Sequence, residues 1–351
     1  MILLTGATGY IGRLVLARLL ERDGPDILCP VRARDEQHAR ERIDAVMHSL
    51  WREPEPQARI RVREVACDLA ALELAPRELA GVTHVLHCAA AVSFDQPIAD
   101  ARAANVASTR AVLDVAHRAP RLERLVHVST AYVAGRTSTV FAESDRDIGQ
   151  SFRNSYEQTK LEAEQLAAAH AHTLPVVVAR PSIVVGEAGT GWTTSFNVVY
   201  PMLRAYRRGL VRSVPASPGA AVDVVTGDYV ADALIALLLD VPGARGTYHL
   251  VAGDGALTMG ALSSLAAEAF GLDPVSFEPP GEGEGGVPQE LAAYFDVRCR
   301  FDARRSRAAL EPLGIRPAAA DEEFGALVAY AERSAWGKRP EVREAAVSLV
   351  A

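Results

Sequence analysis

The stretch Leu3–Gly12 (LLTGATGYIG) decides the fold of this chain. It carries glycines at positions 6, 9 and 12, after the apolar run Ile2–Thr5 and before the helical pattern Tyr10–Arg22. Between a strand and a helix, this spacing is typical of a dinucleotide-binding loop, in which glycines allow a tight turn, a close approach to a pyrophosphate and close helix packing. The free N–H groups at the helix start favour phosphate. A glycine-rich turn without a ligand is the alternative. The expected cofactor contacts are Gly6, Thr8, Gly9, Tyr10, Ile11 and Gly12.

Outward from this stretch, short apolar runs alternate with longer amphipathic ones through the first half of the chain. Nearly continuous runs of Val, Ile, Leu and Cys suit strands that are buried on both faces of a parallel sheet. The alternation predicts an α/β fold with a doubly wound parallel sheet of the Rossmann type. The expected strands are Ile2–Thr5, Ile27–Val31, Ile60–Ala66, Val85–Cys88, Leu125–Ser129 and Val176–Arg180, and the expected helices are Tyr10–Arg22, Glu36–Trp51, Ile98–Arg118 and Ser155–Ala171.

The alternation breaks after Arg180-Pro181. We expect residues 1–185 and 222–252 to form the Rossmann domain, and residues 186–221 and 253–351 to form a smaller C-terminal substrate-binding lid. Val222–Val225 and Tyr248–Val251 are expected to return to the sheet as strands. Glu278–Gln289 has the composition of a loop. Further helices are expected at Phe196–Arg208, Tyr229–Leu239, Met259–Phe270, Ala303–Leu310 and Asp321–Ser334.

Composition narrows the class of protein. The chain has 351 residues, a net charge of −7 and four scattered cysteines. The charge argues against nucleic acid as a partner, and the cysteines lack disulfide or metal spacing. Because Met1 opens directly into a strand and no apolar run approaches the ~20 residues of a membrane span, we expect a cytoplasmic protein without signal peptide or membrane contact. His84, His87 and His127 lie in strand patterns, so core positions are expected and no metal site.

The end of the second expected strand bears on the choice of cofactor. An acid here would hydrogen-bond the ribose hydroxyls of NAD, but the sequence PVRARD places Arg32 and Arg34 there. Guanidinium groups can hold a 2′-phosphate, so NADPH is favoured, while Asp35 keeps NADH as the alternative. Further contacts are expected from Asp68 and Leu69 near the adenine and from the small residues Ala89, Ala90 and Ala91.

Tyr156 and Lys160 form a Y-x-x-x-K pair (YEQTK) at the start of an expected helix. The i, i+4 spacing puts both side chains on one face, where an ammonium can bring the phenol pKa toward the working pH. Taken alone the pair is a weak signal. Three companions strengthen it, namely the hydroxyls Ser129-Thr130 at a strand end, the polar Asn105 in an Ala/Val-rich helix and the strand end Arg180-Pro181-Ser182.

These motifs resemble, over nearly the whole chain, the extended short-chain dehydrogenase/reductase family. The resemblance rests on TGATGYIG, HCAAAV, VHVSTAYVAG, YEQTK and ARPSIVVG in that order. It implies a catalytic triad of Thr130, Tyr156 and Lys160 with Asn105 in support, Thr130 being matched because the family's hydroxyl lies five residues before the glycine at 135. Tyr156 would be the general acid, and Lys160 would lower its pKa and hold the nicotinamide ribose. The nicotinamide pocket would be lined by Pro181, Ser182 and Ile183.

Within that family, VSTAYV, VYPMLRAYRRGLV and VDVVTGDYVADALIALL are more similar to the thioester and fatty acyl-CoA reductases than to the sugar epimerases. The resemblance implies NADPH-dependent reduction of an acyl thioester to an aldehyde and a free thiol, with an alcohol as a second product. The acyl group would come from coenzyme A or from a separate carrier protein, and the enzyme would be a monomer or homodimer. The alternatives are a ketone or aldehyde reductase, an epimerase/dehydratase that retains NAD, and a non-catalytic NADPH-binding regulator.

Some features outside the motifs also carry expectations. Arg204, Arg208 and Arg212 follow at i, i+4 and i+8, so a helix there would present a basic stripe to a phosphate or an acidic carrier protein, although Gly209 interrupts it and a plain solvated face is the alternative. Trp192 and Phe196 are expected to line an apolar acyl pocket or simply to pack within the lid. Asp228 is expected to cap the helix that follows it.

Overall fold

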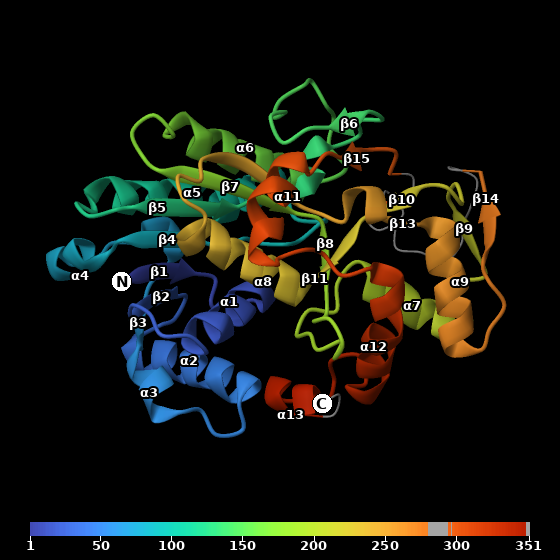
Figure 1. Cartoon of the computed structure of the whole chain (residues 1–351), viewed down its shortest axis with the longest axis horizontal. Coiled ribbons are helices and arrows are strands. Elements are labelled where there is room, and N and C mark those ends of the chain that lie inside the picture. Colours follow the sequence, from blue (N-terminus) through green and yellow to red (C-terminus); the bar gives the residue numbers. More distant parts are fainter. Residues whose placement is uncertain (280–293, 296, 349–351) are drawn as a thin grey trace.

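A seven-stranded parallel sheet forms the centre of the computed structural model shown in Figure 1. The structure describes residues 1–279, 294–295 and 297–348. The strand order is β12-β7-β5-β4-β1-β2-β3, which confirms the doubly wound sheet predicted from the alternation. The strands are β1 (Ile2–Thr5), β2 (Ile27–Val31), β3 (Val62–Ala66), β4 (His84–His87), β5 (Arg124–Val128), β7 (Val176–Pro181) and β12 (Gly246–Leu250).

Helices cover both faces of this sheet. Successive side chains of a strand point to opposite faces. In β1, Ile2 and Leu4 accordingly join one apolar cluster with α1 (Tyr10–Leu20), whereas Leu3 joins a second cluster with α5 (Ile98–Arg118). The remaining covering helices are α2 (Glu36–Leu50) and α8 (Gly227–Ile235) with α1, and α4 (Pro76–Gly81) and α6 (Ser155–Ala169) with α5 (Figure 1).

The strand order reverses at β1, which lies between β4 and β2. In such sheets the carboxyl edge at the reversal is the place where ligands bind. The backbone is unusually close there, since a Cβ on Gly6, whose φ is +78°, would lie 2.7 Å from the amide nitrogen of Ala89. A Cβ on Gly12 would lie 2.1 Å from the carbonyl oxygen of Gly6. Glycine is therefore required at both positions for the loop to fold back against β4.

The rest of the chain forms what we call the C-terminal layer, which lies at the right in Figure 1. Its helices are α7 (Val199–Arg207), α9 (Met259–Phe270) and α12 (Ala320–Arg333), and they surround a separate apolar cluster. Its strands form only two-stranded pieces, β9 (Ser213–Pro215) with β14 (Ser276–Glu278) and β10 (Ala221–Val222) with β13 (Leu257–Thr258). Beside the sheet lie two further such pairs, β8 (Ile183–Val185) with β11 (Val224–Thr226) and β15 (Arg300–Phe301) with β6 (Val140–Phe141).

Two strand expectations can be judged against this arrangement. Tyr248–Val251 was expected to return to the sheet, and β12 does so by pairing with β7. The same expectation for Val222–Val225 is wrong, because β11 pairs with β8, which continues from β7 beyond Pro181 but outside the seven-stranded sheet. Ile60 ends the short helix α3 (Pro56–Ile60) instead of opening a strand. Of the loop expected at Glu278–Gln289, residues 280–289 lie outside the described residues.

The last described helices return toward the sheet. They are α11 (Arg304–Leu310), which contacts β12, and α13 (Arg343–Ser348), which contacts α2. Within the described ranges, none of the helices combines the length and the apolar character that crossing a membrane would require.

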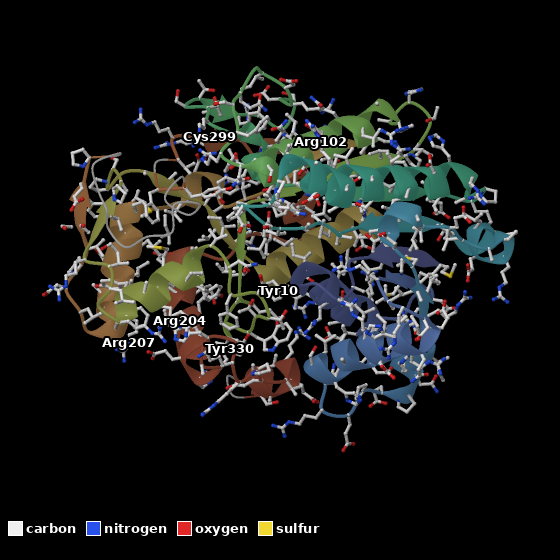
Figure 2. The ribbon with its side chains drawn as sticks, turned by 180° about the vertical axis from the view of Figure 1, so that it is seen from behind. Tyr10, Arg102, Arg204, Arg207, Cys299 and Tyr330 are labelled. Atoms are coloured by element: carbon white, nitrogen blue, oxygen red, sulfur yellow. The ribbon has the colours of Figure 1, made fainter. Side chains whose placement is uncertain are left out.

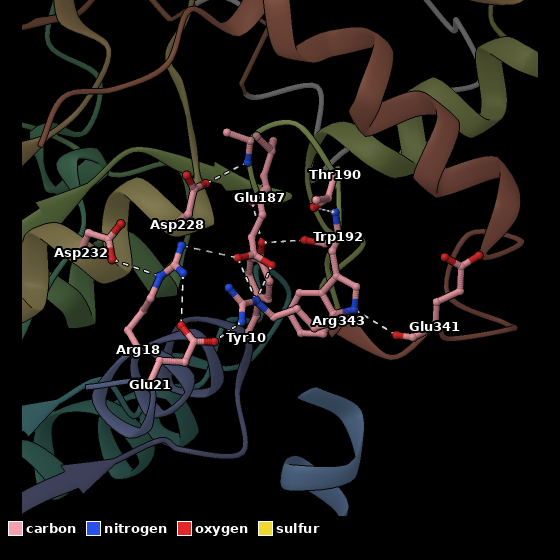
Figure 3. A network of polar contacts seen from close by, with 12 residues as sticks. Tyr10, Arg18, Glu21, Glu187, Thr190, Trp192, Asp228, Asp232, Glu341 and Arg343 are labelled. Atoms are coloured by element: carbon pink, nitrogen blue, oxygen red, sulfur yellow. Dashed lines mark hydrogen bonds and ion pairs between the residues drawn. The ribbon is translucent and has the colours of Figure 1, made fainter. Parts of the chain in front are cut away.

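A buried ionic network fastens α13 to the sheet side of the molecule (Figure 3). The Arg343 guanidinium, 7% exposed, contacts the Glu187 carboxylate at 2.7 Å and the Glu21 carboxylate at 2.6 Å. Arg18 on α1 adds an ion pair to Asp232 at 3.1 Å. Charges this deeply buried are tolerated only when they are paired, so the network fixes how the C-terminal end sits against α1.

Hydrogen bonds in the same region tie the glycine loop to the segment after β8 (Figure 3). The Tyr10 hydroxyl donates to the carbonyl oxygens of Val185 and Trp192, both at 3.0 Å. The Trp192 indole in turn donates to the carbonyl oxygen of Glu341 at 2.9 Å. Asp228 was expected to cap α8, but Thr226 holds the cap position and the Asp228 carboxylate instead accepts from the Ala188 amide at 2.9 Å.

Candidate active site

A cleft of about 1130 Å³ lies along the carboxyl edge of the sheet, where β1, β4, β5 and β7 end. Its walls combine side chains from the sheet edge with others from the segment after β8. Of the residues predicted from the sequence, the cleft brings together Gly6, Gly9, Tyr10, Ile11, Gly12, Ala90, Thr130, Tyr156, Lys160, Pro181, Ser182 and Ile183. It does not include Thr8, Arg32, Arg34, Asp68, Leu69, Ala89, Ala91 or Asn105.

The charged residues outside the cleft follow strands β2 and β3 on the same sheet edge. Arg32 and Arg34 are exposed just after β2. Asp35 caps α2, since its carboxylate accepts from the His38 amide at 2.7 Å, and it also lies 3.4 Å from the Arg34 guanidinium. The Asp68 carboxylate accepts from the Ala70 amide at 3.2 Å and so caps the turn after β3. The acid nearest the β2 end is thus already engaged by the backbone, while both arginines face solvent.

Thr130 and Tyr156 both line the cleft, close enough for the Thr130 hydroxyl to influence the pKa of the phenol. Thr130 lies two residues beyond β5 and is buried; its hydroxyl accepts from the Tyr132 amide at 3.2 Å and donates to the carbonyl oxygen of Pro181 at 3.4 Å. Burial raises the pKa of Tyr156 to about 12, although the Thr130 hydroxyl acts to lower it. The phenol is therefore protonated at neutral pH, which is the form that a general acid needs. Burial has the largest effect on this pKa and Lys160 is not among its causes here, so the expected lowering by Lys160 stays a prediction.

Lys160 lies one helical turn beyond Tyr156 on α6, as the i, i+4 spacing predicted. Its ammonium is 3% exposed and donates to the carbonyl oxygen of Val128 at 2.7 Å. Burial lowers its pKa to about 8, against the opposing charge of Glu164. A lysine tuned in this way can change its charge state near neutral pH.

Asn105 acts from behind the cleft wall. Its side-chain oxygen accepts from the Ala91 amide at 2.8 Å, and its amide group donates to the carbonyl oxygen of Ala91 at 3.3 Å and to the Thr159 hydroxyl at 3.0 Å. It thus joins the loop after β4 to α6, immediately beside Lys160. Asn105 therefore contacts the elements that carry the cleft and does not line the cleft itself.

Near Ser182, on the opposite wall, lies a buried carboxylate that the sequence reasoning left aside. Asp223 is 4% exposed, and its two oxygens accept from the amides of Ala252 and Gly253, both at 2.9 Å. Burial raises the pKa of Asp223, while the Ser182 hydroxyl and the two amides act to lower it. The signal that could have found it is an acid inside the apolar run VDVV, where an unpaired charge would be costly.

Three aromatic side chains near Tyr156 were also missed. Phe94 lies 5.9 Å from the Tyr156 ring and 5.2 Å from Tyr294, and Tyr132 lies 5.5 Å from Tyr294 between ring centroids. All three line the cleft. Tyr132 could have been read from the STAYV motif, but Tyr294 is distant in sequence and carries no local signal that would place it here.

The strand histidines lie in the core, as predicted for His87 and His127. Burial lowers the pKa of His87 to about 3 and that of His127 well below its usual range, so both imidazoles are neutral behind Lys160. His84 is partly exposed. No three His, Cys, Asp or Glu side chains of the described segments cluster closely enough to hold a metal ion.

A second cavity of about 760 Å³ lies next to the cleft, within the C-terminal layer. Ile183, Val198 and Tyr294 line both spaces. The cavity walls are almost entirely apolar. The other lining residues are Val199, Met202, Leu203, Tyr206, Val211, Val214, Val222, Met259, Leu262, Ser263, Ala266, Val275 and Phe295.

Trp192 and Phe196, which were expected to line an apolar acyl pocket or to pack within the lid, take the second role. Trp192 is fully buried, with its ring 6.0 Å from that of Tyr10. Phe196 stacks on Tyr330 at 6.3 Å and meets Tyr200 edge-on at 5.1 Å. Neither side chain borders the apolar cavity.

The expected basic stripe is shorter than three arginines. Helix α7 ends at Arg207, and Gly209 takes a φ of +69° that breaks the pattern before Arg212. Arg204 and Arg208 remain on one face, whereas Arg207 pairs with Glu332 on α12 at 3.0 Å.

Comparison with known proteins places this arrangement among relatives. The family model described as "Male sterility protein" matches residues 4–234, more than half of the chain. Human fatty acyl-CoA reductase 2 is 27% identical over 298 residues, covering 72% of this chain and 58% of the relative. Fatty acyl-CoA reductase 1 of Xenopus laevis is 28% identical over 276 residues, covering 67% of this chain and 53% of the relative. The matched region thus spans little more than half the length of these curated relatives.

Solved structures share the fold over nearly the whole chain. The terminal R domain of the myxalamid PKS-NRPS biosynthetic pathway superposes with a TM-score of 0.78 at 25% identity, covering 97% of this chain and 92% of that one. UDP-glucuronic acid 4-epimerase from Bacillus cereus, in complex with NAD, has a TM-score of 0.70 at 16% identity, with 95% and 98% covered. At that identity the second likeness concerns the fold alone.

Proposed function

Since the chain belongs to the male sterility protein family, within the fatty acyl-CoA and thioester reductase branch of the extended short-chain dehydrogenases/reductases, we propose that it reduces an acyl thioester to an aldehyde with NADPH. Further reduction of the aldehyde to an alcohol at the same site is part of the proposal. Thr130, Tyr156 and Lys160 are the proposed catalytic residues, and Asn105 is a positioning residue.

The observation that carries this proposal is that the apolar cavity lies directly beside the triad cleft. Ile183, Val198 and Tyr294 border both, so a carbonyl held at Tyr156 has an apolar space beside it for a hydrocarbon chain. An apolar lining of this kind stabilises an acyl tail through the hydrophobic effect and offers almost nothing to a sugar hydroxyl. The cavity therefore favours an acyl substrate over the nucleotide sugar of an epimerase.

The chemistry of the site follows from its two hydroxyls. Thr130 and Tyr156 line the same cleft, and both hydroxyls can donate to the oxygen of a thioester carbonyl. Donors preorganised toward a developing oxyanion usually provide the largest stabilisation of such a transition state. Tyr156 then gives its proton to that oxygen, which forms the hemithioacetal. On collapse the hydroxyl proton returns to the Tyr156 phenolate as the carbon–oxygen double bond forms, the carbon–sulfur bond breaks, and the departing thiolate takes up a proton to leave as free thiol beside the aldehyde. The nearby Lys160 ammonium offsets the charge left on the phenolate.

The residues at the sheet edge fit a nicotinamide dinucleotide. A Cβ on Gly9 would meet only the Gly6 carbonyl oxygen, at 3.4 Å, so the start of α1 is open to a pyrophosphate. The bound cofactor would supply the hydride that reduces the carbonyl carbon. Pro181, Ser182 and Ile183 would contact the nicotinamide, and Lys160 its ribose. Around the adenine end we propose Thr8, Arg32, Arg34, Asp68, Leu69 and Ala89–Ala91, in addition to the glycine loop.

The preference for NADPH rests on Arg32 and Arg34. Both are exposed beyond β2, and Asp35 is engaged in capping α2. Replacement of Arg32 by Ala should weaken NADPH binding by roughly tenfold or more, because charge-assisted hydrogen bonds to the 2′-phosphate are lost, and should spare NADH. Binding titrations with both cofactors measure this, and equal losses would show that Arg32 does not contact the 2′-phosphate.

The remaining parts of the proposal concern organisation. Residues 1–185 and 222–252 would bind the cofactor, while 186–221 and 253–351 would bind the acyl chain, as the lining of the apolar cavity supports. The thiol partner would be coenzyme A or a carrier protein, and the enzyme would act as a monomer or homodimer in the cytoplasm. All four cysteines are unpaired thiols, which suits a reducing compartment.

The direct test follows NADPH absorbance with acyl-coenzyme A and acyl-pantetheine thioesters, in parallel with matched aldehydes and ketones. We expect consumption with thioesters and stoichiometric release of free thiol. Consumption with ketones alone would move the enzyme to the ketone reductases. Tight NADPH binding without turnover of any member of the panel, including a carrier-bound thioester, would favour a regulator.

A further inference from the structure

A groove on the outer side of the C-terminal layer is used neither by the triad nor by the acyl cavity. It measures about 710 Å³ and lies on the face of α7 that is turned away from the apolar cavity. Figure 2 labels Arg204 and Arg207 of this helix. The lining residues are Phe196, Tyr200, Pro201, Arg204, Ala205, Arg208, Leu210 and Trp336.

The two arginines of the groove lack anionic partners among the described residues. The side chains of Arg204 and Arg208 form neither an ion pair nor a hydrogen bond within these segments, and the Nε of Arg204 is buried without an acceptor. Arg207, between them in sequence, behaves differently, because it pairs with Glu332 and lies over the Phe270 ring. Arg208 is exposed and Arg204 half-buried, and neither guanidinium is paired with a carboxylate of the described segments, so the groove offers two cationic groups to an anion.

The opposite wall of the groove is held in a strained backbone conformation. Ala335 and Trp336 have φ values of +50° and +57°, a region that side chains other than glycine rarely adopt. Gly337 follows with a φ of +84°, and a Cβ there would lie 2.7 Å from the Phe196 ring. The bond from the Trp336 amide to the Ala331 carbonyl oxygen, at 2.7 Å, fixes this turn. Strain of this kind persists where a structure must present a side chain in a set place, here the indole of Trp336.

From this combination we infer that the groove binds the nucleotide end of coenzyme A, with Arg204 and Arg208 on its phosphates and Trp336 against its adenine. The inference rests on the proposed thioester reduction and identifies the thiol carrier. One guanidinium group can donate hydrogen bonds to two phosphate oxygens at once, and the face of an indole ring stacks on a purine. A carrier protein would bring one phosphate and no base, so the aromatic wall of the groove favours the nucleotide.

The groove lies close enough to the catalytic cleft for one acyl-coenzyme A molecule to place its nucleotide in the groove and its thioester in the cleft. Ser195, Asn197 and Val198 line the cleft, while Phe196 and Tyr200 of the same segment line the groove. A single stretch of backbone thus separates the two spaces. The pantetheine arm of coenzyme A joins its nucleotide to the thioester and would cross this stretch.

Binding of free coenzyme A, measured by calorimetry on the full chain, tests the groove without any turnover. We expect Arg208→Ala and Arg204→Ala each to weaken binding by about tenfold, since charge-assisted hydrogen bonds are lost. Arg207→Ala is the matched control from the same helix and should bind as the unchanged chain does. Binding should weaken with added salt, and phosphopantetheine, which lacks the adenine, should bind less tightly and be insensitive to Trp336→Leu.

Kinetics separate this inference from the proposed function. With acyl-coenzyme A, Arg208→Ala should raise KM and leave kcat unchanged, while acyl-pantetheine turnover should not change at all. Turnover of acyl-pantetheine together with coenzyme A binding that ignores Arg204 and Arg208 would overturn the groove but keep the reductase. Arginine-dependent coenzyme A binding without thioester turnover would keep the groove but overturn the reductase. A requirement for Arg208 only with a carrier-bound thioester would overturn the nucleotide and assign the groove to a carrier protein.

Discussion

The sheet edge and the C-terminal layer are built on different principles. At the sheet edge, Lys160 and Thr130 contact backbone atoms of β5 and β7, strands that are paired along most of their length and buried on both faces. In the C-terminal layer the strands are two or three residues long, and the layer is fastened through side chains such as Arg343. The first arrangement fixes atoms within a rigid scaffold, whereas the second leaves the shape of the cavities to packing.

This difference separates the expected effects of substitution. Changes at the sheet edge should act on kcat, because the proposed catalytic groups belong to the scaffold. Changes inside the C-terminal layer should act on which substrate is taken, and changes at its fastening should act on stability. Each of the following experiments measures one of these three properties. An effect on a different property from the one expected would contradict this difference between the two regions.

The largest effect is expected from Tyr156→Phe. Loss of the general acid should lower kcat by about a thousandfold, within the usual range for such groups, while NADPH binding is retained. Steady-state kinetics and a cofactor titration measure the two properties separately. Tyr248→Phe, which removes a phenol from β12 away from the cleft, is the matched control and should keep its activity. Full activity of Tyr156→Phe would show that another group donates the proton.

The second-largest effect concerns the free energy of unfolding, to which the buried ion pairs of Arg343 contribute. Arg343→Met leaves the Glu187 carboxylate, 6% exposed, without its closest partner, and removing one member of a buried pair costs about 3 kcal/mol or more. Burial already raises the pKa of Glu187, so the loss should shrink as the pH falls and the carboxyl becomes protonated. Denaturant unfolding at two pH values measures both quantities.

Arg18→Met is the comparison for that variant. Arg18 is 30% exposed in its pair with Asp232, and exposed pairs contribute about 1 kcal/mol or less. Equal losses for the two variants would mean that burial does not set the strength of this network.

The sequence predicted the sheet edge well because its signals are local. Runs such as Ile2–Thr5 are buried along their whole length, and glycines 6 and 12 stand where a Cβ would collide with backbone. The family predicted from these motifs is confirmed by the match over residues 4–234. The assigned roles of Thr130, Tyr156 and Lys160 stay predictions, although the fold brings the three into one cleft.

The C-terminal layer could not be predicted in the same way, because its contacts join distant segments. Tyr294 reaches the Tyr132 ring across the sequence, and Arg343 reaches Glu187, without any periodic pattern that announces either contact. Val222–Val225 has the apolar character of a sheet strand, yet β11 pairs outside the main sheet. In this segment, β propensity and the apolar pattern indicate only that the residues are buried. Tertiary packing decides which strand they pair with.

A smaller effect should change substrate selectivity alone. Ala266 on α9 lines the apolar cavity, so Ala266→Leu removes space for the end of an acyl chain. Because each methylene in an apolar pocket contributes about 1–3 kcal/mol, we expect the kcat/KM ratio of long over short acyl thioesters to fall by roughly tenfold. Ala269→Leu, on the exposed face of the same helix, should leave the ratio unchanged. An unchanged ratio in Ala266→Leu would place the acyl chain elsewhere.

The last effect is the dependence of turnover on pH. Burial lowers the pKa of Lys160 to about 8, so its ammonium is present below that pH and is lost above it. If the charged form supports the phenolate of Tyr156, kcat should be level below pH 8 and then fall by about tenfold for each further pH unit. An apparent pKa near the ordinary value of lysine would contradict the lowering of the Lys160 pKa by burial.

The comparison between the sheet edge and the C-terminal layer becomes sharper with Arg208→Ala, because arginine stays charged throughout this range. That variant should raise KM for acyl-coenzyme A at every pH, and its kcat should still begin to fall at pH 8. A change in the pH at which kcat begins to fall would mean that the groove and the triad act as one site.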